Sequence, residues 1–248
     1  MARWGRVLGV SAWHGQYLAQ VYGLSNTDYV PNGIELDDFA EPAVKVPFRV
    51  VYGSSPDRGL AKLLRMWPSI VENEPSAELH VAYGWETIDK SIRLGATQLI
   101  PVKQEITDLL AKTPGVKWLG RLKQKDLHAL YQSATVWAYP TSFLEVSCIT
   151  AMECMAAGCV PVTSRTGALP ETIGDAGLLV DGDTYSESWD EFFVSVLRGA
   201  IVSPEARAVY SQRGIERAKA YTWDEAFSRW ESLISSLQGA KEGEKVLV

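Results

Sequence analysis

Short hydrophobic runs alternate with segments of helical periodicity along the middle of the chain. The runs typical of buried strands cover residues 48–53, 77–84, 116–120, 134–140, 159–164 and 176–183. The segment after the first run places its large apolar residues on one helical stripe: Leu60, Leu63, Leu64, Trp67 and Val71. Strands that alternate with helices predict βαβ units, and therefore an α/β fold with a doubly wound, Rossmann-like parallel sheet.

The two ends of the chain differ from this middle part. Residues 7–24 have the pattern of a strand, a turn and a helix, and a turn-rich connector follows at 29–39. From about residue 185 the chain is mostly helical, and its last stripe carries Trp223, Phe227, Trp230 and Ile234. We expect residues 1–30 to be the end of a preceding domain, 31–238 to form the main domain with C-terminal helices, and 239–248 to be a flexible tail.

Residues 54–62 follow the first predicted strand, at the edge where parallel sheets of this kind bind ligands. Pro56 suits the start of a helix, whose amides and dipole favour an anion. Arg58 and Lys62 have i,i+4 spacing, so both are candidates to contact that anion. A Walker motif is absent, and an ordinary helix start with two solvated cations remains the alternative.

Two glutamates stand out in the apolar stretch 140–158. A helix is predicted to begin near Ser147, with Glu145 in the loop before it and Glu153 about two turns into it. Residues 146–150 would present the unpaired amides of the helix start. An ionised carboxylate only accepts hydrogen bonds, so it suits hydroxyls, whereas amides and a cation suit phosphate.

This arrangement fits a ligand with hydroxyls at both ends and charge in the middle, such as a nucleotide-sugar. Glu153 would bind the ribose hydroxyls, Glu145 the sugar hydroxyls, and Arg58 with the amides the diphosphate. In the alternative interpretation, Glu145 complements the helix dipole and Glu153 lies on a solvated face. The apolar and sulfur-bearing neighbours of Glu153 leave little polar face for that alternative.

Composition and charge narrow the classes of function that the sequence could have. The net charge of −6 argues against a general nucleic-acid binder, and no apolar run approaches membrane-spanning length. The three cysteines, Cys148, Cys154 and Cys159, have no CxxC pair, which favours packed thiols in a reducing cytoplasm. The acidic pair at 181–183 is predicted to be a turn and no metal site is expected; His128 is predicted to lie on a helix surface and His80 in strand packing.

The serial order of several segments resembles a known family. The resemblance is carried by the paired glutamates, by residues 116–131 and 135–140 before them, and by residues 159–180 after them. Together these segments resemble the nucleotide-binding C-terminal half of retaining glycosyltransferases of the GT-B fold, specifically family 4. The resemblance covers about residues 29–230, and the connector at 29–39 resembles the link between the two halves of that fold.

The resemblance implies roles for individual residues. Glu145 would contact the donor sugar and Arg58 the diphosphate, as the catalytic pair, and Glu153 would bind the ribose. The other donor-binding residues that it implies are Ser54, Lys62, Arg121, Leu122, Val146, Ser147, Cys148 and Ile149. Two features depart from the family's pattern: Ser147 and Cys148 replace residues of its usual EGFG, and Ser54 stands where the family often has a basic residue.

The implied function is transfer of a hexose-type sugar from a nucleotide-diphosphate sugar to an acceptor, with retention and without a metal or other cofactor. Because the chain carries little of an N-terminal half, it would be a fragment, or another chain would supply that half. A nucleotide-sugar-binding subunit without activity of its own is the second hypothesis, and a GT-B epimerase or phosphorylase the third. A cytoplasmic location is expected, and peripheral membrane attachment stays open.

Overall fold

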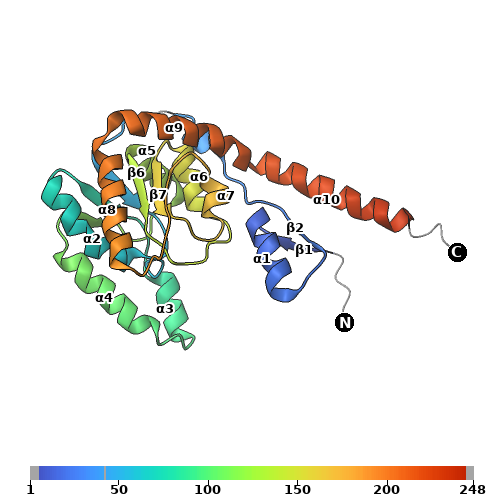
Figure 1. The fold of residues 1–248 in the computed structure, drawn as a ribbon, viewed down its shortest axis with the longest axis horizontal. Helices are drawn as coiled ribbons and strands as arrows, with labels where there is room; N and C mark the ends of the chain where they lie inside the picture. The colour runs from blue at the N-terminus through green and yellow to red at the C-terminus, as the bar shows by residue number, and fades with distance from the viewer. Residues whose placement is uncertain (1–5, 42, 244–248) are drawn as a thin grey trace.

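A computed structural model describes residues 6–41 and 43–243, with side chains as far as residue 238. Its main body is a six-stranded sheet in which every neighbouring pair is parallel (Figure 1). The strands are β3 (Arg49–Tyr52), β4 (Glu78–Val81), β5 (Val116–Trp118), β6 (Val136–Tyr139), β7 (Val160–Ser164) and β8 (Leu178–Val180). The predicted doubly wound parallel sheet is confirmed, and each strand lies in a run expected from the sequence.

Helices cover both faces of the sheet. They are α2 (Leu60–Asn73), α3 (Glu86–Arg93), α4 (Leu99–Lys112), α5 (Gln124–Ser133), α6 (Ile149–Ala156), α7 (Leu169–Ile173), α8 (Glu187–Val202) and α9 (Pro204–Ala218). α2 contacts α4 and α8 in one layer, and α6 contacts α5 and α9 in the other. The central strands β6 and β7 are buried at every residue, as expected for a parallel sheet with two covered faces.

The strand order locates a ligand-binding edge. The order β5-β4-β3-β6-β7-β8 means that the chain builds outward from β3 and then returns to β6 to build the other way. The helices that follow β3 and β6, α2 and α6, therefore cover opposite faces of the sheet. In open α/β sheets, ligands bind in the crevice that such a reversal creates. Arg58 follows β3 and Glu145 follows β6, so the topology brings both loops to this crevice.

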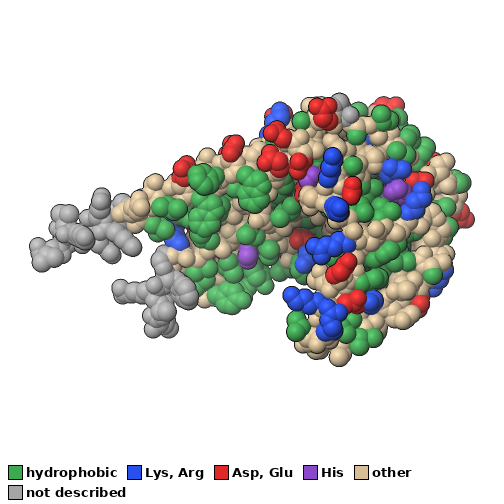
Figure 2. All heavy atoms as spheres, turned by 180° about the vertical axis from the view of Figure 1, so that it is seen from behind, with side chains coloured by type: hydrophobic (Ala, Val, Ile, Leu, Met, Phe, Trp, Pro, Cys, Tyr) green, Lys and Arg blue, Asp and Glu red, His purple; other side chains and the backbone are tan. Residues whose placement is uncertain are grey.

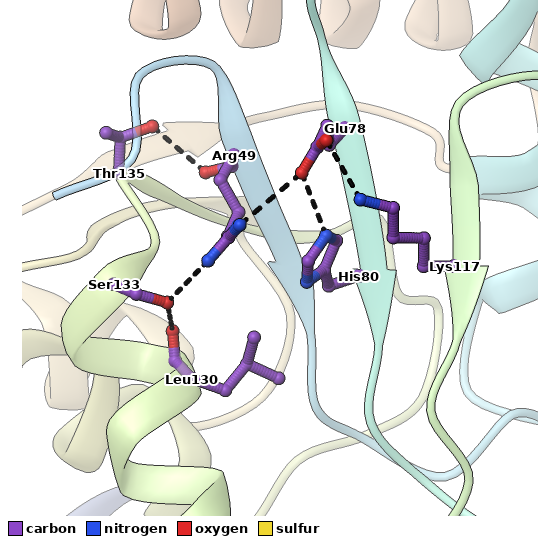
Figure 3. A network of polar contacts seen from close by, with 7 residues as sticks. All are labelled: Arg49, Glu78, His80, Lys117, Leu130, Ser133 and Thr135. Carbon is purple, nitrogen blue, oxygen red and sulfur yellow. Dashed lines mark hydrogen bonds and ion pairs between the residues drawn. The ribbon is translucent and has the colours of Figure 1, made fainter.

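A network at the opposite edge fastens the amino ends of the first three strands (Figure 3). Glu78, the first residue of β4, contacts Arg49 of β3, His80 of β4 and Lys117 of β5. The Lys117 ammonium contributes most to lowering the pKa of Glu78. His80 is buried in strand packing, as predicted, and its desolvation lowers its pKa. The network lies at the opposite ends of the strands from the switch-point crevice, and we interpret it as a structural network.

A small N-terminal unit precedes the main body. β1 (Val7–Gly9) and β2 (Thr27–Tyr29) form a two-stranded parallel sheet joined by α1 (Ala12–Tyr22). The 3-10 turn η1 (Leu36–Phe39) follows in the connector. The strand and helix were expected, but β2 was not: Tyr29 was placed in the connector, and the strand depends on pairing with β1.

The last helix, α10 (Trp223–Gly243), extends from the main body as an arm (Figure 1). The helix continues to Gly243, past residue 239 where the tail was predicted to begin, and the flexibility of that tail remains a prediction. Residues 244–248 lie outside the described part. The predicted stripe of Trp223, Phe227, Trp230 and Ile234 is about half-exposed, and Figure 2 shows apolar side chains gathered along this arm.

The last helix, α10, also contacts the N-terminal unit. The Arg229 guanidinium lies 2.6 Å from a carboxylate oxygen of Asp28 and stacks over the ring of Tyr29 at 4.9 Å. A hydrogen bond from the Tyr29 amide and the charge of Arg229 lower the pKa of Asp28. Within the described residues, no helix combines the length and the apolar content needed to span a membrane.

Candidate functional site

The loop after β3 is held against the loop after β6 by a glycine. Gly59 has φ +112°, a left-handed value that a residue with a side chain rarely adopts. A Cβ at this position would lie 2.5 Å from the carbonyl oxygen of Pro140, so only glycine permits the approach. The close contact brings Arg58 beside Glu145: Arg58 Nη1 is 3.4 Å from Glu145 Oε1, and the guanidinium lies 3.9 Å from the centre of the Phe143 ring.

Glu145 is a buried carboxylate, 5% exposed, and the protein supplies partners for it. The Tyr139 hydroxyl donates to Glu145 Oε1 at 2.6 Å, in addition to the contact from Arg58. Burial and the nearby Glu145 charge raise the pKa of Tyr139 well above its ordinary value, so the phenol remains a donor. The Ala168 amide donates to the Glu145 carbonyl at 2.7 Å, which fixes the backbone as well.

Glu153 is also buried, at 8% exposed, which excludes the alternative that it lies on a solvated face. Gln124 Nε2 donates to Glu153 Oε1 at 2.8 Å, and His128 Nε2 lies 3.2 Å from the same oxygen. Burial raises the pKa of Glu153, and the contacts with His128 and Gln124 oppose that shift. The prediction that His128 lies on a helix surface is wrong, because α5 packs this side chain between α6 and the connector.

A cleft of about 490 Å³ opens beside Glu153, at the carboxyl ends of the strands. Three predicted donor-binding residues line it together with Glu153: Arg121, Leu122 and Ile149. Gly53 lines it too and joins it to the Arg58 loop, while the Thr150 hydroxyl donates to the Gly53 carbonyl at 3.5 Å. Among the lining residues that sequence reasoning missed are Tyr83, Gly84, Glu86, Thr87, Gln124 and Leu127. The first four follow β4 at its carboxyl end, which is the signal that identifies them.

The start of α6 differs from the prediction. The helix begins at Ile149, and Glu153 lies about one turn into it instead of two. Cys148 occupies the N-cap position without a side-chain cap and is buried, which raises the pKa of its thiol. The Ser147 hydroxyl accepts from Asn32 Nδ2 at 3.1 Å, and the Val146 carbonyl accepts from the Ser11 hydroxyl at 2.7 Å. The connector and the N-terminal unit thus hold the loop between the two glutamates.

Lys62 does not lie with Arg58. Its ammonium is 2.6 Å from Asp190 Oδ1, donates to the Thr184 carbonyl and lies over the ring of Trp189. The i,i+4 rule does not apply here, because α2 begins at Leu60 and Arg58 precedes the left-handed Gly59. Ser54 is buried at the end of β3. The donor-binding roles of Lys62 and Ser54 remain predictions.

The other candidates have structural settings. Asp181 accepts from the Gly182 amide and Asp183 from the Tyr185 amide, which makes this acidic pair the predicted turn. The three cysteines are buried with free thiols, as expected. Among the described residues, no group of three or more acidic, histidine or cysteine side chains is arranged to hold a metal ion. Glu171 accepts from the Ala12 and Trp13 amides, at 2.9 and 2.7 Å, and ties α1 to the main body.

A family model matches the part of the chain that carries this site. The family model described as "Glycosyl transferases group 1" matches residues 49–198, more than half of the chain, from β3 into α8. The chain belongs to this family. The match spans Arg58, Glu145, Glu153 and every residue that lines the cleft beside Glu153. The parallel sheet with its flanking helices is the Rossmann-like domain of the GT-B fold.

Individual relatives agree with the family. O-antigen chain mannosyltransferase B of Escherichia coli is 31% identical over 109 residues, which cover 44% of this chain and 27% of that protein. A crystal structure of S. aureus TarM with fondaparinux, alpha-GlcNAc-glycerol and UDP superposes with a TM-score of 0.71 at 13% identity, over 92% of this chain and 43% of that one. The GtfA/B complex gives 0.73 at 14% identity, over 95% and 46%. The chain spans less than half the length of each of these proteins.

Proposed function

We propose that this chain is the donor-binding part of a glycosyltransferase that uses a nucleotide-diphosphate sugar. The observation that carries the proposal is a buried carboxylate, Glu153, in the wall of an open cleft at the switch point of the sheet, beside the Arg58–Glu145 pair. A carboxylate buried with one side toward a cleft has an acceptor for hydroxyls there. The membership in the group 1 family supports the same reaction class.

The residues have distinct tasks in this proposal. Glu153 accepts from the ribose hydroxyls, with Arg121 and Leu122 beside the base. Arg58 and the first amides of α6 bind the diphosphate and stabilise the charge that develops on it as the sugar leaves. Glu145 contacts the donor sugar and holds Arg58 in place when no donor is bound. A hexose-type sugar, retention of configuration and membership of family 4 belong to the same proposal and rest on the spacing of the two glutamates.

The partner of this donor site is a second domain. The chain covers less than half of its relatives, and a solved structure with the same fold, the GtfA/B complex, joins more than one component. We propose that an N-terminal domain, in the same polypeptide or in another chain, completes the acceptor side. The second candidate function, a nucleotide-sugar-binding subunit without activity of its own, is favoured by the half-exposed stripe on α10, which is suited to a further protein surface.

The test is a calorimetric titration of the chain with UDP, GDP and ADP. We expect one of them to bind, and Glu153→Gln to weaken that binding about 10-fold, because a charged acceptor becomes a neutral one. The matched control is Glu78→Gln, the same change at the opposite edge of the sheet, which should leave the affinity unchanged. If no nucleotide binds, or if both variants bind like the wild type, the site is wrongly assigned. Sugar transfer by the chain alone would rule out the second candidate.

Donor binding is expected to be independent of divalent cations. In the proposal Arg58 and the helix amides balance the diphosphate charge, as a metal does in other enzymes. Titrations with the same nucleotide in EDTA and in Mg²⁺ should give dissociation constants within about twofold of each other, whereas a bound metal contributes several kcal/mol. A loss of binding in EDTA that Mg²⁺ restores would contradict this part of the proposal.

A further inference from the structure

One histidine connects the two acidic side chains that flank α5. His128 is 6% exposed, and its two ring nitrogens point at carboxylates from different parts of the chain. Nδ1 lies 3.1 Å from Asp38 Oδ2, and Nε2 lies 3.2 Å from Glu153 Oε1. Asp38 belongs to η1 in the connector, whereas Glu153 belongs to α6 beside the cleft. The imidazole thus bridges the connector and the proposed ribose site.

The connector holds the imidazole firmly. The ring of Phe39, the residue after Asp38, lies 4.6 Å from the His128 ring, so η1 contributes both a polar contact and a ring contact. α5 and η1 are packed against each other, and α5 also packs on α6. The position of His128 therefore depends on the position of the connector.

The contacts at Glu153 are one-sided. Among the described residues, the hydrogen bonds to this carboxylate come from Gln124 and His128, and both reach Oε1. Gln124 Nε2 also lies 2.7 Å from His128 Nε2. In the neutral tautomer with its proton on Nδ1, Nε2 accepts from Gln124 and aims that amide at Glu153; the doubly protonated ring donates to Glu153 directly. In the first state Gln124 supplies the hydrogen bond to Oε1 and His128 orients that amide, whereas in the second His128 itself donates to Oε1; in both states Oε2 is left to a ligand.

We propose that His128 is a positioning residue for the donor site, and that it couples the connector to recognition of the ribose. It orients Glu153 either directly or through the Gln124 amide, so that the other oxygen of this buried carboxylate faces the ligand. Asp38 and Phe39 keep the imidazole in place, so a change in the connector reaches the ribose contact through one side chain. The inference rests on the proposed function, because it assigns Glu153 to the ribose.

The experiment compares two nucleotides in each variant. The nucleoside diphosphate among UDP, GDP and ADP that binds best is titrated beside its 2′,3′-dideoxy counterpart. The dissociation constant of the dideoxy compound divided by that of the natural nucleotide measures the ribose contact. Two substitutions separate the ends of the ring: His128→Gln keeps a polar group near the Nε2 position, whereas His128→Asn reaches only as far as Nδ1. We expect His128→Asn to lower the ratio about three- to tenfold and His128→Gln to restore most of it.

Controls keep the outcomes distinct. His80→Gln and His80→Asn remove another buried histidine that is paired with a glutamate, at the opposite sheet edge, and should leave the ratio unchanged. Asp38→Asn should lower the ratio about twofold; an unchanged ratio there would overturn the coupling to the connector. If Glu153→Gln abolishes the discrimination while His128→Asn retains it, the role of His128 is refuted and the proposed function stands. If Glu153→Gln also retains it, the ribose assignment fails and this inference fails with it.

Discussion

Arg58→Ala should weaken nucleoside diphosphate binding about 100-fold, which corresponds to about 2.7 kcal/mol. The Arg58 guanidinium lies at the carboxyl edge of the sheet, where the β3 and β6 loops meet. Its planar fork can donate two parallel hydrogen bonds to a diphosphate, and each charge-assisted bond contributes roughly 1.5–3 kcal/mol. Calorimetry on the purified variant measures the change directly.

Two comparisons show whether the loss comes from the phosphates. The free nucleoside lacks them, so Arg58→Ala should bind it as well as the wild type does; an equal loss for nucleoside and diphosphate would contradict the assignment. Arg65→Ala removes the same side chain from an exposed pair with Glu105 and serves as the matched control. Lys62→Ala should have an effect below about threefold, because Asp190 already pairs with that ammonium at 2.6 Å.

Arg58 also neutralises a buried charge, and this second role can be separated from the first. Without Arg58, the Glu145 carboxylate keeps the Tyr139 hydroxyl but loses its adjacent cation. An uncompensated buried charge is destabilising, so Arg58→Ala should also lower the free energy of unfolding. The double variant Arg58→Ala, Glu145→Gln removes both charges and should recover stability without recovering diphosphate binding.

The fold was predictable because its signal is local. A strand buried on both faces needs apolar residues at nearly every position; β6 has them throughout, and β7 has them in its first three residues before Thr163 and Ser164. The helices between the strands are predicted in the same way by the spacing of their apolar residues, as for α2 with Leu60, Leu63 and Leu64. The order of the strands carries no such signal, because pairing between β3 and β6 joins segments more than eighty residues apart.

The site was predictable only in part, because its contacts are tertiary. The two glutamates were found as charges in an apolar stretch, yet their protein partners lie elsewhere in the sequence. The histidine at 128 looks like an ordinary surface residue of a short helix until α6 and η1 are placed against it. Lys62 shows the opposite error: spacing alone placed it with Arg58, and one left-handed glycine before the helix separates them.

The unusual residues after Glu145 have a physical account in the fold. Ser147 accepts a hydrogen bond from Asn32 of the connector, and Cys148 enters the hydrophobic core at the start of α6. Neither side chain lines the cleft beside Glu153. The loop between the glutamates is instead fastened on its outer side by the connector and by Ser11 of the N-terminal unit. The loop between the two glutamates is therefore in direct contact with the connector.

Gly167→Ala should be among the most damaging single substitutions near the site. Gly167 has φ +59°, and a Cβ there would press directly on the Glu145 carbonyl oxygen. The backbone conformation alone costs an alanine about 1–2 kcal/mol, and overpacking adds roughly 1–3 kcal/mol. Because the pressure falls on Glu145 itself, the variant should lose diphosphate affinity as well as stability. Urea unfolding and calorimetry measure the two effects.

Gly23 provides a matched control, because it has nearly the same backbone conformation without the contact. Its φ is +63°, it ends α1, and a Cβ there would meet no atom within 4 Å. Gly23→Ala should therefore lose only the conformational part, about 1–2 kcal/mol of unfolding free energy, and keep its diphosphate affinity. The difference between the two variants isolates the contact between Gly167 and Glu145. Equal losses of stability, with binding intact in both, would show that this contact does not position Glu145.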